Sequence, residues 1–113
     1  MSAELTRGNV VICNAAGRAL RKKPASVRVC DVLWCYGNFN TGDSVYISFC
    51  GADGGQSVIA TGTVACAKSE LDIKIGPPRA DSWLVGPNAK DDLSVVIPAE
   101  QVQLLWPPHE VQT

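Results

Sequence analysis

Short apolar segments alternate with clusters of turn-forming residues along the chain of 113 residues, a pattern typical of a β-rich domain. One segment alternates strictly, so Val45, Ile47 and Phe49 are expected to face the core. Tyr46 and Ser48, between them, are expected to face the opposite way. The sequence predicts strands over residues 8–13, 27–36, 44–50, 57–66, 93–97 and 102–106.

Two further segments have the composition of short helices. Asn14 can cap a helix that runs to Leu20, because the residues between them are good helix formers and the basic end suits the helix dipole. Residues 68–75 form a second helical stretch, which the following Gly-Pro-Pro sequence ends. The whole pattern predicts a mainly β fold with short helices, a pseudo-barrel of about six strands and two helices.

The body of the chain has no internal repeat or linker, which predicts one domain over residues 8–106 with flexible ends at 1–7 and 107–113. Hydrophobic residues make up 46% of the chain, enough for a packed core, but no apolar run is long enough for a membrane-spanning helix. The first residues lack the basic and apolar regions of a secretory signal, so a cytoplasmic location is expected.

The odd number of cysteines, without a signal peptide, indicates reduced thiols. No two cysteines have the C-x-x-C spacing, and the only histidine, His109, lies near the C-terminus, so the sequence offers no zinc site. We therefore expect small buried apolar cysteines, no bound metal and no cofactor. The five are Cys13, Cys30, Cys35, Cys50 and Cys66.

Basic residues gather in the first part of the chain. Residues 1–40 hold six basic and two acidic residues, a net charge of +4, whereas residues 41–113 hold four basic and nine acidic residues, a net charge of −5. The total of −1 argues against a generic nucleic-acid binder, but the basic part could meet an anionic partner. The alternative is that the two parts are solvated faces of one domain.

The candidate binding residues belong to the first predicted helix and the segment after it. Helical spacing places Arg18, Arg21 and Lys22 on one face, and Lys23 and Arg28 continue the positive charge. Phosphate groups of RNA could bind there. The plainer alternative is a solvated helix end, where basic residues compensate the carbonyl end of the helix dipole.

Four blocks in collinear order resemble the PUA domain family, and specifically the PUA domain at the C-terminus of glutamate 5-kinases. Together they span most of the chain, from residue 8 to residue 106. The blocks are residues 8–20 (GNVVICNAAGRAL), 37–47 (GNFNTGDSVYI), 59–76 (IATGTVACAKSELDIKIG) and 96–105 (VIPAEQVQLL).

The resemblance implies a PUA-like pseudo-barrel. It also implies that RNA, if bound, contacts the first helix and the following loop, where Asp31 introduces a negative charge that repels phosphate. In a glutamate 5-kinase-like protein the domain would be a regulatory or architectural accessory in proline biosynthesis, beside a separate kinase domain. The alternatives are a free-standing PUA protein that binds structured RNA and a protein–protein interaction module.

No residue pattern predicts catalysis, so the chain alone is not expected to be an enzyme. The glycine-rich segment 51–55 lacks the Lys, Ser or Thr of a phosphate-binding loop and is expected to form a hairpin turn. Asp91 and Asp92 are expected to be solvated. Trp34 is expected to pack in the core, and Trp83 is the better candidate for an exposed contact with RNA.

Overall fold

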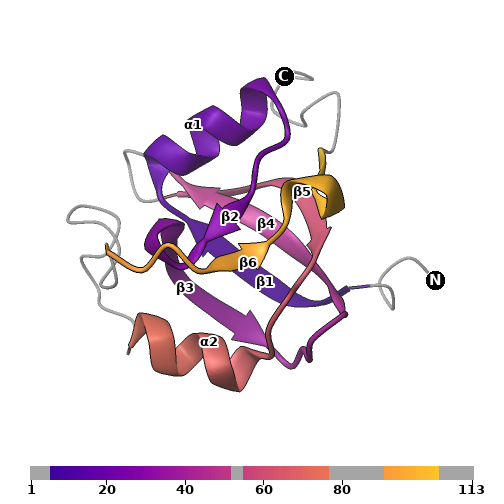
Figure 1. The fold of residues 1–113 in the computed structure, drawn as a ribbon. Coiled ribbons are helices and arrows are strands. Elements are labelled where there is room, and N and C mark those ends of the chain that lie inside the picture. The colour runs from indigo at the N-terminus through magenta and orange to yellow at the C-terminus, as the bar shows by residue number, and fades with distance from the viewer. Residues whose placement is uncertain (1–5, 52–54, 77–90, 105–113) are drawn as a thin grey trace.

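The computed structural model describes residues 6–51, 55–76 and 91–104 (Figure 1). Its elements, where η marks a single 3-10 turn, are β1 (Thr6–Ile12), α1 (Asn14–Lys22), β2 (Val27–Arg28), η2 (Val29–Asp31), β3 (Val32–Gly37), β4 (Ser44–Cys50), β5 (Gln56–Thr63), α2 (Lys68–Ile75), β6 (Val95–Ile97), η3 (Ala99–Gln101) and β7 (Gln103–Leu104). The prediction of a mainly β fold with two short helices is confirmed, and the described residues form seven strands instead of about six.

Five strands form one mixed sheet in the order β3-β1-β4-β5-β7, while β2 pairs with β6 in a separate two-stranded sheet. β1 and β4 run parallel, and the other pairs within the described residues are antiparallel. Figure 1 shows α1 and α2 at opposite ends of the molecule, with the strands between them. Neither helix of this described part is long and apolar enough to cross a membrane.

One face of the five-stranded sheet carries the main hydrophobic core. Directly paired residues point to the same face, so one row of side chains crosses the whole sheet. This row consists of Cys35, Val10, Ile47, Ala60 and Leu104. Its first four members are buried and Leu104 packs at the margin, with apolar residues of both helices and of β6 completing the core.

The opposite face of the sheet is also partly covered. Val11, Leu33 and Cys50 form a second buried cluster, against which Trp34 packs half-buried. Ser48 pairs with Val11 and so faces away from the main core, as the alternation predicts, yet only 1% of it is exposed. Trp34 thus belongs to this smaller cluster and not to the main core, while residue 83 lies outside the described residues.

The predicted single strand over residues 27–36 is wrong, because η2 divides it into β2 and β3, which belong to different sheets. The Arg28 N–H donates a hydrogen bond of 3.2 Å to Asp31 Oδ2 and closes the turn. The Cys30 N–H then donates to Asp92 O at 2.8 Å. A short polar side chain that accepts a local backbone hydrogen bond favours a turn over a continuing strand.

Several other elements differ from the prediction only at their ends. β1 begins at Thr6, two residues before the expected start, and α1 continues to Lys22. β5 ends at Thr63, because the N–H of the next residue, Val64, donates to Asp43 O in the turn before β4. The predicted hairpin between β4 and β5 is confirmed by their antiparallel pairing, although residues 52–54 are outside the described part.

Candidate nucleic-acid interface

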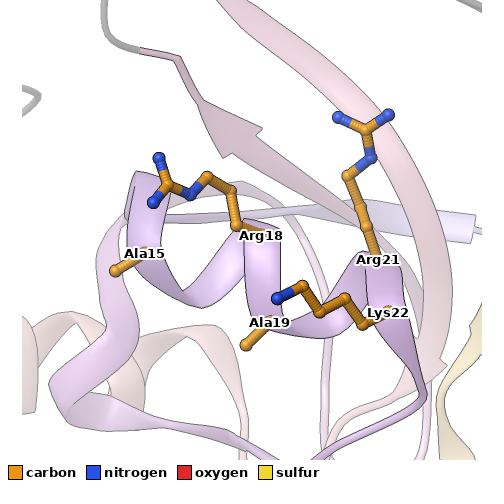
Figure 2. A pocket seen from close by; sticks show the side chains of 5 residues that line it. All are labelled: Ala15, Arg18, Ala19, Arg21 and Lys22. Carbon is orange, nitrogen blue, oxygen red and sulfur yellow. The ribbon is translucent and has the colours of Figure 1, made fainter.

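The exposed face of α1 carries two small side chains and two cations. Ala15, Arg18, Ala19 and Lys22 are all exposed, at the spacing of a single helix face. Together with Arg21 they line an open depression of about 440 Å³ (Figure 2). In Figure 2 the Lys22 side chain extends back along the helix toward Arg18, whereas Arg21 extends away from both. The small side chains of the two alanines leave room beside the cations for an anionic group.

The other side of α1 is packed on the sheet through Gly17 and Leu20. Leu20 is 2% exposed and belongs to the main core. Gly17 is also buried, and a Cβ added there would lie 2.4 Å from the Cβ of Phe49 in β4. The missing side chain therefore allows α1 to lie directly on β4, and this contact fixes which face of the helix reaches solvent.

Arg21 contacts the sheet in addition to lining the depression. Its guanidinium carbon lies 5.7 Å from the centroid of the Phe49 ring, within the range of a cation–π interaction. The side chain is half-buried, unlike those of Arg18 and Lys22. The structure thus brings the three predicted cations of α1 to one depression but gives Arg21 a packing role as well.

Lys23 and Arg28 lie at the two ends of the segment that follows α1. Lys23 directly follows the helix and is exposed. Arg28 is exposed too, but its Nη1 donates a hydrogen bond of 2.9 Å to Leu93 O. Lys23 therefore extends the positive charge of α1, whereas Arg28 holds the segment before β6 against β2.

Asp31 is the first acidic residue after Glu4, so the sequence between them contributes only positive charge. Its carboxylate is used inside η2, where it accepts hydrogen bonds from the Arg28 N–H at 3.2 Å and from the Cys30 thiol at 3.9 Å. Arg18, Arg21, Lys22 and Lys23 form the basic face of α1. Within the described residues, no carboxylate forms an ion pair with Arg18, Lys22 or Lys23.

The chain resembles known proteins in its fold and not in its sequence. No protein-family model matches the sequence, and no curated protein matches it. Among solved structures the chain is similar to a PUA domain from Aeropyrum pernix K1, crystallised in complex with tartrate, with a TM-score of 0.60 and 20% sequence identity. The chain has a PUA-like fold. The match covers 88% of this chain and 44% of that chain, so the chain spans less than half the length of the protein that it resembles.

No disulfide joins the cysteines of this PUA-like fold within the described residues, where Cys35 and Cys50 are buried and the other three are half-buried. The Cys35 thiol donates to Asp72 Oδ1 at 3.3 Å, and burial together with this bond raises the pKa of Cys35 to about 12. A thiol with so high a pKa stays protonated and is a poor nucleophile near neutral pH. No group of three His, Cys, Asp or Glu side chains that could hold a metal occurs in the same described segments.

Asp91 and Asp92 stand before β6 and have different surroundings. Asp91 is exposed. The Asp92 Oδ1 accepts a hydrogen bond of 2.9 Å from the Ser94 N–H. Hydrogen bonds from the side chain and then from the backbone of Ser94 lower the pKa of Asp92. Asp92 therefore helps to form the turn into β6, while Asp91 is solvated as expected.

Three residues of the site were not singled out by sequence reasoning. Phe49 was expected in the core, but it is half-buried and its ring contacts both α1 and Arg21. Ala15 and Ala19 lie beside the cations because residues 15, 18, 19 and 22 share one helix face. The helical spacing that groups Arg18 with Lys22 could also have identified Ala15 and Ala19. The position of Phe49 could not be found in this way, because it depends on how α1 packs on the PUA-like sheet.

Proposed function

We propose that this chain is a non-catalytic module that contacts the phosphate backbone of RNA through the basic face of α1. The observation that carries the proposal is the arrangement of Arg18, Lys22 and Lys23. All three are exposed, and the described residues supply no carboxylate partner for them. Phosphate groups can therefore bind these cations without displacing an existing ion pair.

The shape of the surface supports the same conclusion. The depression of about 440 Å³ is open and bordered by Ala15 and Ala19, which keep the helix surface low between the charged groups. RNA-binding PUA domains use the region around the first helix and the following loop, and the fold of this chain is PUA-like. Phosphate contacts of this kind give affinity that depends on salt and position the protein without reading the base sequence.

Asp31 is compatible with this function. Its negative charge lies in the segment that should face RNA, but the carboxylate already accepts two local hydrogen bonds inside η2. The backbone N–H of Arg28 is one of the two donors. The repulsion of phosphate by Asp31 is thereby reduced.

The test is a titration of a fluorescently labelled RNA hairpin at two salt concentrations. Lys22→Ala is compared with Lys74→Ala, since both residues are exposed lysines in the last turn of a helix. We expect Lys22→Ala to weaken binding and to lower the slope of log affinity against log salt by about 0.7–0.9. The Lys74→Ala variant should bind like the natural sequence. Absence of salt-sensitive binding, or equal losses in both variants, would overturn the proposal.

We further propose that the module serves as an accessory domain of a glutamate 5-kinase-like protein. The support is the collinear order of the four sequence blocks, a resemblance that spans residues 8–106. The open reading frame that encodes the chain tests this proposal directly, because it must also encode an amino-acid-kinase region. ATP- and glutamate-dependent turnover by the isolated chain would contradict the non-catalytic role.

A further inference from the structure

A second hollow lies away from the basic face, where β4, β5, η3 and β7 meet. It has a volume of about 360 Å³, within the size range of small-molecule sites. Six of the residues that line it have polar side chains: Ser44, Thr61, Thr63, Glu100, Gln101 and Gln103. This density of hydroxyl, amide and carboxylate groups distinguishes the hollow from the depression beside α1.

The strand register explains why these groups lie together. Ser44 of β4 pairs with Thr63 of β5, and Thr61 of β5 pairs with Gln103 of β7. Paired residues share a face, and so do residues two apart on one strand. The three hydroxyls and the Gln103 amide therefore project from the same face of the sheet, opposite to the main core.

Within the described residues, the polar side chains of the hollow have no internal hydrogen-bond partner. For the described residues, the structure records no side-chain hydrogen bond of Ser44, Thr61 or Thr63. Glu100 is exposed and likewise has no ion pair with the lysines and arginines of these segments. Donors and acceptors that converge on a hollow without internal partners are available to a ligand.

The row of paired residues continues from the hollow to a buried amide. Thr61 pairs with Tyr46, and Tyr46 pairs with Asn9, so the three side chains stand next to one another on one face. Asn9 is 8% exposed, and its Oδ1 is buried without a hydrogen-bond partner. A buried carbonyl oxygen without a donor is costly, and this one belongs to the same face of the sheet as the polar groups of the hollow.

We propose that this hollow binds the vicinal hydroxyl groups of a neutral sugar ring, either a free pyranose or the ribose of a nucleoside, next to Tyr46, which pairs with Thr61 of the hollow. No lysine or arginine is among the described residues that line the hollow, so this lining offers an anion no cationic partner, and the Glu100 carboxylate repels one. A carboxylate accepts hydrogen bonds from two neighbouring hydroxyls, while hydroxyl and amide groups both donate and accept. An apolar sugar face can pack on an aromatic ring.

The hollow is separate from the surface proposed to contact RNA. Ser44 is the first residue of β4 and Phe49, which contacts α1, is the sixth, so about 16 Å of strand lies between them. Binding of sugar in the hollow therefore does not require the basic face. If RNA binding by the basic face is absent, sugar binding by the hollow can still be measured, and the reverse is also true.

The test is an NMR titration of the full chain with two uncharged probes, methyl α-D-glucopyranoside and uridine. We expect saturable shifts of the Thr61, Thr63 and Gln103 amides, with dissociation constants of about 1–10 mM. Glu100→Gln and Thr61→Val should each weaken binding about tenfold, because the first replaces a charged acceptor oxygen with an amide donor and the second removes a hydroxyl, while both keep the shape of the side chain. Asp91→Asn and Ser69→Ala, which change an exposed carboxylate and an exposed hydroxyl elsewhere, should have no effect.

The two probes distinguish the sources of the sugar ring. Binding of uridine but not of 2′,3′-dideoxyuridine would assign the hollow to ribose, and binding of the glucoside alone would assign it to a pyranose. Either result supports the proposal. It is overturned if neither probe gives saturable shifts, or if the shifts persist unchanged in both Glu100→Gln and Thr61→Val.

Discussion

Gly17 of α1 lies directly against Phe49 of β4, so closely that an added Cβ would come within 2.4 Å of the Phe49 Cβ and 2.6 Å of its Cγ. The guanidinium of Arg21 covers the same ring at 5.7 Å. One aromatic side chain therefore sets both the distance of α1 from the sheet and the direction of Arg21. The consequence is that Arg18 and Lys22 are left on the outer face of the helix.

The Gly17→Ala substitution tests this close contact. Helix propensity alone predicts that alanine stabilises an interior helix position by about 1 kcal/mol. The contact with Phe49 predicts the opposite sign, a loss of about 1–3 kcal/mol, because the new methyl group meets an atom that cannot move aside freely. Urea denaturation followed by circular dichroism measures the free energy of unfolding.

Ala19→Ser is the matched control, since Ala19 is exposed on the same helix. Its effect should stay within about 0.5 kcal/mol. If Gly17→Ala proved more stable than the natural sequence, α1 would not lie on Phe49 at the distance described.

Truncation of Arg28 should lower mainly the stability of the fold, whereas truncation of Arg18 should lower mainly the affinity for RNA. Arg28→Ala removes the hydrogen bond of 2.9 Å to Leu93 O, so we expect a loss of about 0.5–1.5 kcal/mol in stability with a small change in RNA affinity. Arg18→Ala should leave stability within about 0.5 kcal/mol but weaken RNA binding. Denaturation and RNA titration of both variants provide the comparison. A loss of RNA affinity in Arg28→Ala as large as that in Arg18→Ala, at unchanged stability, would instead place Arg28 in the interface.

The alternation of apolar and polar residues predicted most of the fold because it reports which side chains face the core. It located α2 and β4 without error and the remaining long elements to within a few residues. It failed over residues 27–36, where a run of β-branched residues is typical of a strand but the Asp31 carboxylate closes a turn. Periodicity contains no information on a side chain that bonds to its own backbone.

The candidate site was predictable in composition but not in detail. Helical spacing brought Arg18, Arg21 and Lys22 together, and the structure has them around one depression. Spacing could not show that Arg21 covers Phe49 or that Arg28 reaches Leu93, since both contacts join segments distant in sequence. The hollow at β5 and β7 was likewise unpredicted, because its residues meet only through the pairing of strands.

Substitutions of Gly42 test the conformation of the turn between β3 and β4. Its φ of +93° is unfavourable for residues with a side chain, while nothing lies within 4 Å of an added Cβ. Gly42→Ala should therefore destabilise through backbone strain alone, by about 1–2 kcal/mol. Gly42→Asn should cost less, because asparagine tolerates positive φ better than alanine. Equal stability of Gly42→Ala and of the control Thr41→Ala, both measured by denaturation, would show that the turn adopts another conformation.

The raised pKa of the Cys35 thiol allows a prediction of how the free energy of unfolding changes at alkaline pH. The Asp72 carboxylate lies between this thiol, at 3.3 Å, and the Lys68 ammonium, at 2.6 Å, and so joins α2 to β3. Burial, followed by the hydrogen bond to Asp72, raises the pKa of Cys35 from 9.0 to about 12. The unfolded chain therefore releases this proton at a lower pH than the folded protein does.

Because the folded pKa is the higher one, the contribution of Cys35 is fully present below pH 9 and is lost as the pH rises toward 12. The free energy of unfolding should fall over this range in the natural sequence, and less steeply in Cys35→Ala, which has no thiol to titrate at this position. Burial also raises the pKa of Cys66, but that residue is present in both proteins, so the difference between the two slopes isolates Cys35. Parallel curves above pH 9 would mean that the thiol of the folded protein titrates at its ordinary pKa, and that Asp72 and burial do not hold its proton.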